Sequence, residues 1–151
     1  MNRAVLIAAM VCGATAAADE APARCRFRVV HALLQEGDVD EKLAPLRDRL
    51  GRAPFREWRT FRLLSEEERD LKPTDAVEFP LPEGRRAQVL YAEHAAGPDG
   101  KHVVRGALTL TGKKKETRTM FALDEGGVLL VAGQKHAGGI LIYALSCKTE
   151  K

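Results

Sequence analysis

The chain has 151 residues, a length that fits a single domain with a substantial buried core. Its formal net charge is only +3, from 24 basic and 21 acidic residues, which argues against a dedicated nucleic-acid-binding protein. Aromatic residues make up 5% of the chain, too few to fill a core and also line a sugar-binding cleft.

The amino terminus has the three parts of a secretory signal peptide. Arg3 supplies a positive charge, residues 4–11 form a short apolar run, and residues 13–18 are small. We expect residues 1–18 to be cleaved after Ala18 and residues 19–23 to form a flexible lead-in. Residues 24–151 are then expected to fold as one globular β-rich domain.

This leader predicts an exported protein, periplasmic or extracellular. The apolar run is too short to span a bilayer, and no later run is long enough, so no transmembrane segment is expected. The alternative is a lipoprotein anchored through Cys12, although Val11 stands where a lipoprotein signal has a small residue.

Two cysteines remain after such a cleavage, Cys25 and Cys147, near the two ends of the chain. An exported protein with an even number of cysteines usually oxidises them. Neither cysteine lies in a Cys-x-x-Cys motif that would lower a thiol pKa for redox chemistry. We therefore predict a structural Cys25–Cys147 disulfide that brings the first and last strands together in the core.

The first predicted strand runs from Arg24 to about Leu34. Its residues alternate, with Cys25 and Phe27 on one face and arginines on the other, which is typical of a half-buried strand. Residues 40–51 then change to helical spacing and predict one short amphipathic helix. Pro45 fits only the first turn of a helix, so the helix is expected to be distorted or to begin late.

Aromatic and leucine residues predict a second strand over residues 55–64. The acidic run that follows, beginning Ser65-Glu66-Glu67-Glu68, resembles a capping box, and either a helical turn or a polar strand edge is compatible with it.

The rest of the chain alternates short strands with turns. Strands are predicted near residues 77–81, 87–91, 104–110, 117–123, 128–132 and 139–147, with loops at 97–100, 112–115 and 133–139. The expected fold is therefore α+β and β-rich: a mainly antiparallel sandwich or partly open barrel of about seven or eight strands, with one short helix near the N-terminal end.

No catalytic, cofactor or metal signature is found in the sequence. The only serines, Ser65 and Ser146, lie outside any nucleophile motif. His94 and His102 flank a predicted hairpin loop and, with Glu93, form the one candidate metal site; two exposed polar residues beside a turn are the alternative. We therefore expect no enzymatic activity, no cofactor and no metal.

The candidate interaction surface is the row formed by Arg24, Arg26 and Arg28. Three cations projecting from one strand can receive an acidic protein, an anionic polymer or lipid head groups. The alternative is a solvated sheet face or a charged edge that prevents aggregation. The glycine-containing loop 133–139 is the second segment considered, against the alternative of a plain connector.

These features predict an exported, non-enzymatic β-rich module that binds another envelope or secreted protein through exposed strand edges or the arginine row. The alternative is a carrier or sensor with a small ligand or metal inside, or at the mouth of, a small barrel. Strand order and oligomeric state do not follow from the sequence.

Overall fold

The computed structural model describes residues 22–96 and 99–149. The predicted signal peptide, its cleavage site and Cys12 lie outside these residues. Within the described ranges, no helix is long and apolar enough to cross a membrane.

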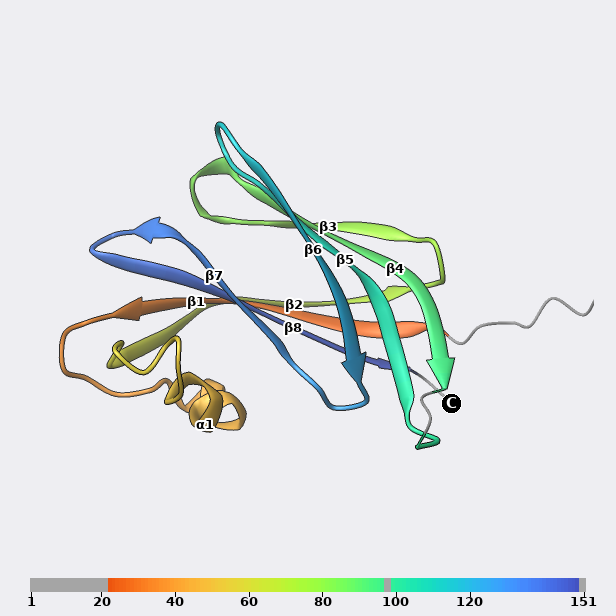
Figure 1. Cartoon of the computed structure of the whole chain (residues 1–151). Coiled ribbons are helices and arrows are strands. Elements are labelled where there is room, and N and C mark those ends of the chain that lie inside the picture. Colours follow the sequence, from red (N-terminus) through yellow and green to blue (C-terminus); the bar gives the residue numbers. More distant parts are fainter. Residues whose placement is uncertain (1–21, 97–98, 150–151) are drawn as a thin grey trace, which may run out of the picture.

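Eight antiparallel strands form two four-stranded sheets that pack face to face (Figure 1). The first sheet has the order β2 (Thr60–Leu71), β1 (Ala23–Leu33), β8 (Gly139–Thr149) and β7 (Leu129–His136). The second has the order β3 (Ala76–Pro80), β4 (Arg86–Ala96), β5 (His102–Thr111) and β6 (Glu116–Asp124). The predicted β-rich sandwich with one short helix is confirmed.

The main core lies between the sheets. Phe27 of β1 stacks on Phe79 of β3, with ring centroids 4.9 Å apart, and on Tyr143 of β8, with centroids 5.8 Å apart. The inward-facing residues of β1 are those that the period-two pattern predicted. Burying such rings contributes most of the hydrophobic stabilisation of a small domain.

The first and last strands are neighbours, and a disulfide joins them. Cys25 of β1 lies directly opposite Cys147 of β8, and the two sulfur atoms are bonded. Both cysteines are almost completely buried in the main core. The bond lies inside the sandwich and links two positions that are 122 residues apart in the sequence.

A second, smaller core lies on the outer face of the first sheet. The 3₁₀ helix η1 (Glu41–Leu46) and the single turn α1 (Arg47–Leu50) bury Leu43, Leu46 and Leu50 against Val30 of β1 and its neighbours. Pro45 lies within η1, which agrees with a distorted helix, because proline has no N–H to donate to an α-helical bond.

One expectation about the second strand is corrected, and one open alternative is decided. The second strand begins at Thr60 rather than at residue 55, because Phe55 is buried in the smaller core through a turn and not through a strand. The strand also continues through the acidic run to Leu71, so of the two alternatives for this run the polar strand edge is the one observed, because β2 is an outer strand of its sheet.

The predicted loop 133–139 is mostly strand. β7 extends to His136, and β8 begins at Gly139, so the turn itself is only Ala137 and Gly138, both at positive φ. A shift in register between Ala132 and Lys135 accommodates the extra residues as a bulge.

Candidate functional site

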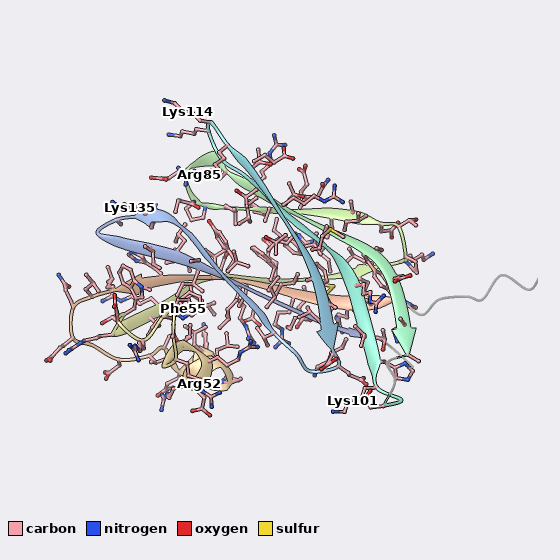
Figure 2. All side chains as sticks on the ribbon, viewed as in Figure 1. Arg52, Phe55, Arg85, Lys101, Lys114 and Lys135 are labelled. Carbon is pink, nitrogen blue, oxygen red and sulfur yellow. A yellow bond between two sulfur atoms is a disulfide. The ribbon has the colours of Figure 1, made fainter. Side chains whose placement is uncertain are left out.

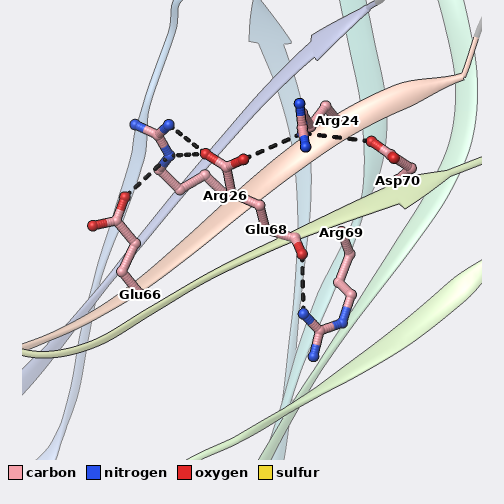
Figure 3. Close-up of polar contacts among 6 residues, drawn as sticks. All are labelled: Arg24, Arg26, Glu66, Glu68, Arg69 and Asp70. Atoms are coloured by element: carbon pink, nitrogen blue, oxygen red, sulfur yellow. Dashed lines mark hydrogen bonds and ion pairs between the residues drawn. The ribbon is translucent and has the colours of Figure 1, made fainter.

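The arginine row of β1 faces a row of carboxylates on β2. In the strand register, each arginine lies opposite an acidic residue. The pairs are Arg24 with Asp70, Arg26 with Glu68, and Arg28 with Glu66. We call these six residues the charge ladder; Figure 3 shows most of its contacts.

The ladder is held by ion pairs that cross from rung to rung. Arg24 Nε lies 3.2 Å from Glu68 Oε2, Arg26 Nε lies 3.1 Å from Glu66 Oε1, and Arg26 also contacts Glu68. The hydrogen bond from Arg26, together with its charge and those of its neighbours, lowers the pKa of Glu68 against the opposing effect of desolvation. The cations of the candidate surface are thus neutralised within the protein itself.

The remaining residues of the acidic run face the other way. Arg69 lies over the ring of Phe79, 5.7 Å from its centroid, and Arg69 Nη2 lies 2.9 Å from Glu67 Oε2. The side chains of the run therefore alternate between the two faces of β2. Glu66, Glu68 and Asp70 face the arginine row, and Glu67 and Arg69 lie on the side of the core. The period-two spacing of Glu66, Glu68 and Asp70 against the arginines was the sequence signal for this pairing.

His94 and His102 lie against each other across the β4–β5 hairpin. Their rings stack with centroids 4.7 Å apart and an interplanar angle of 17°. Glu93 is engaged elsewhere, since its Oε1 accepts a hydrogen bond from Arg105 at 3.2 Å. The described residues contain no group of three potential metal ligands, and His94 and His102 are seen as a stacked pair.

The two sheets diverge toward the end that holds the β5–β6 hairpin (Figure 1). A cleft of about 630 Å³ opens between the β5–β6 hairpin and β7, and we call it the mouth cleft. Leu110 and Val131 supply its apolar walls, and the hairpin residues Lys113, Lys114 and Lys115 line its rim.

Polar groups lie on the inner side of the mouth cleft. Tyr143 Oη donates a hydrogen bond of 2.7 Å to Gln134 Oε1, and burial raises the pKa of Tyr143. Gly133 permits this contact, because a Cβ at that position would lie 2.6 Å from Cε2 of the tyrosine ring. Arg85 Nε and Gln134 Nε2 also belong to this cleft, and both are shielded from solvent without a hydrogen-bond partner.

Of the segment 133–139, Gly133 and Gln134 line the mouth cleft, and they do so from strand β7 and not from a loop. Sequence reasoning read Lys113–Lys115 only as a turn and did not single out Arg85. Their convergence depends on how far the two sheets diverge, for which the local sequence carries no signal.

The sequence suggested exposed strand edges as a binding route without showing which strand lies at an edge. β6 is an edge strand that pairs only with β5, and its Met120 is 68% exposed, the most exposed of the large hydrophobic side chains described. A sheet can add a strand from another chain at an unpaired edge. An exposed apolar side chain at such an edge offers surface that the added strand would bury.

The fold and the cleft define a two-sheet antiparallel β-sandwich with an open, basic-rimmed cleft at one end. No protein family model matches the chain, and no curated protein or solved structure matches it.

Proposed function

We propose that the protein is an exported, non-enzymatic module that binds another protein of the envelope through the free edge of β6. The observation that carries this proposal is the nine-residue edge strand with its exposed Met120. An extended segment of a partner would pair with the backbone of β6 and cover the methionine.

The other three sheet edges are less suited to receive a strand. β3 has only five residues and ends in Pro80. The start of β2 is covered by the segment at Asp40, whose N–H donates to the carbonyl of Phe61, and the rest of β2 is highly charged. β7 carries the bulge between Ala132 and Lys135. Charges, proline and bulges are devices that protect edges from pairing.

The arginine row supports a partner less well than β6 does. Each arginine already contacts a carboxylate of β2, and Arg28 is 8% exposed. An acidic partner would have to displace these carboxylates before gaining the same contacts, so little net affinity would result.

Export is supported by the disulfide and by the composition of the leader. Disulfides persist in oxidising compartments, and the bond between Cys25 and Cys147 is buried in the core. The proposed location is the periplasm or the extracellular space.

The test is a crosslinked pull-down of the tagged mature protein from its own envelope extract, analysed by mass spectrometry. Met120→Lys is compared with Leu64→Lys, a matched change at a leucine that is 45% exposed on the opposite sheet. The proposal expects one dominant partner that Met120→Lys removes and Leu64→Lys retains. Equal capture by both variants, or no specific capture by the wild type, would contradict it.

The mouth cleft favours a second candidate function, that of a small-ligand carrier or sensor. Its volume of about 630 Å³ lies within the range of roughly 300–1,000 Å³ of small-molecule sites. This candidate does not involve Met120, which does not line the mouth cleft, although Thr117 at the start of β6 does.

A further inference from the structure

Basic side chains gather around the mouth cleft. Figure 2 shows Lys114, Arg85 and Lys135 at the end where the sheets diverge, with Lys101 at the opposite end of the molecule. Lys113 and Lys115 flank Lys114 on the hairpin, and all three line the cleft.

Few acidic groups balance this charge. Glu83 is the one ion-pair partner of Arg85 among the described residues, and its Oε2 lies 3.9 Å from Arg85 Nη2. Lys113, Lys114 and Lys115 have no ion-pair partner within the described part of the chain. The charge ladder, by contrast, is neutralised by its own carboxylates. The rim of the mouth cleft is therefore the more strongly cationic surface, and its field attracts anions.

The interior of the cleft offers donors beside an apolar wall. Leu110 and Val131 pack against the main core and leave part of their surface in the cleft. Gln134 Oε1 accepts from Tyr143, so the free hydrogen-bonding group of this amide is its Nε2 donor. Arg85 Nε is the second free donor. Both atoms are shielded from solvent, so a ligand would reach these side chains through their more exposed groups, and the Arg85 side chain is 21% exposed.

We propose that the mouth cleft binds a free, single-chain amphiphile with an anionic head, such as a fatty carboxylate. The apolar chain would lie between the sheets against Leu110 and Val131. The head group would pair with the partly exposed guanidinium of Arg85, beneath the lysines of the β5–β6 hairpin. This inference rests on the second candidate function, a small-ligand site in the mouth cleft, and does not depend on the binding of a protein at β6.

The surface around the cleft fits one extracted molecule better than a bilayer. A protein that docks on a membrane exposes large apolar side chains that enter the acyl region. The large exposed hydrophobic residues of the described chain are Leu34, Leu64 and Met120, and none of them lines the cleft. The apolar surface offered to a chain is inside the cleft and not on its rim.

The test is isothermal titration calorimetry of the mature protein with dodecanoate below its critical micelle concentration. Dodecyltrimethylammonium has the same chain with a cationic head, and vesicles of phosphatidylglycerol present an anionic head in a bilayer. We expect saturable 1:1 binding of dodecanoate, weakened by added salt, with little binding of the cationic analogue.

Two variants and one control locate the site. Arg85→Met removes the inner charge at similar length, and we expect it to weaken binding by about tenfold or more, since hydrogen bonds to charged groups are strong. Lys114→Glu reverses a rim charge and should weaken binding and reduce its salt dependence. Lys101→Glu is the matched control at the far hairpin and should leave the affinity unchanged.

Any of the following results would overturn the proposal. Absence of dodecanoate binding would do so, as would equal binding of the cationic analogue or equal affinity of Lys114→Glu and Lys101→Glu. Binding to vesicles without binding to free dodecanoate would replace the free amphiphile with a membrane surface. The melting temperature of each variant without ligand shows whether a loss of binding reflects a loss of folding.

Discussion

Reduction of the buried disulfide is expected to remove much of the stability of this domain. The bond joins residues 122 positions apart, so it constrains nearly the whole chain in the unfolded state. The chain-entropy relation for a loop of this length gives about 4 to 5 kcal/mol. Small domains have about 5 to 15 kcal/mol in total, so the reduced protein should lie much closer to the unfolding threshold.

The measurement is urea unfolding of the mature protein, oxidised and reduced, followed by circular dichroism. Reduction leaves both side chains in place, so no cavity contributes to the difference. Because Cys25 is 1% and Cys147 0% exposed, a reductant should reach them only when the protein opens, and native reduction should be slow. A difference in unfolding free energy below about 1 kcal/mol would refute the loop-entropy reasoning.

Three further perturbations test the smaller core, the charge ladder and the cleft wall. Leu46→Ala should cost about 2 to 5 kcal/mol in urea unfolding, because it empties a fully buried site under the helical segment. Arg26 lowers the pKa of Glu68, so this contribution to stability is present above the ordinary value of 4.5 and is lost as pH falls below it. Glu68→Gln should therefore flatten the decline of stability between neutral and acidic pH, and an unchanged profile would contradict this role. Gly133→Ala should cost about 1 to 3 kcal/mol, since its Cβ would overlap the ring of Tyr143, and a neutral result would show that β7 can move.

Two substitutions serve as controls for these changes. Leu34→Ala alters a leucine that is 58% exposed, and Gly51→Ala adds a Cβ whose nearest neighbour, Arg47 O, lies at an ordinary 3.5 Å. Both should remain within about 0.5 kcal/mol of the wild type, as surface changes usually do. Losses as large as those of Leu46→Ala would indicate general fragility instead of specific packing.

Local patterns in the sequence were sufficient for the class of fold. Alternation of side chains along a strand requires only the two-residue period of β structure, so the inward face of β1, with Cys25 and Phe27, could be predicted directly. Turn residues separated most strands for the same local reason. The start of β2 and the extent of β7 were predicted wrongly, because burial under the helical segment and a bulge depend on distant residues.

The candidate sites depended on tertiary structure. The arginine row was visible in the sequence, but its neutralisation required the pairing of β1 with β2 in one particular register. The mouth cleft unites Arg85, the β5–β6 hairpin and β7, which come from both sheets. Side-chain period and turn chemistry act over a few residues, whereas strand order and the divergence of two sheets follow from packing across the whole domain. The sequence by itself therefore determined the strands and their buried faces, and only the tertiary structure decided which charges are balanced and which remain free to bind.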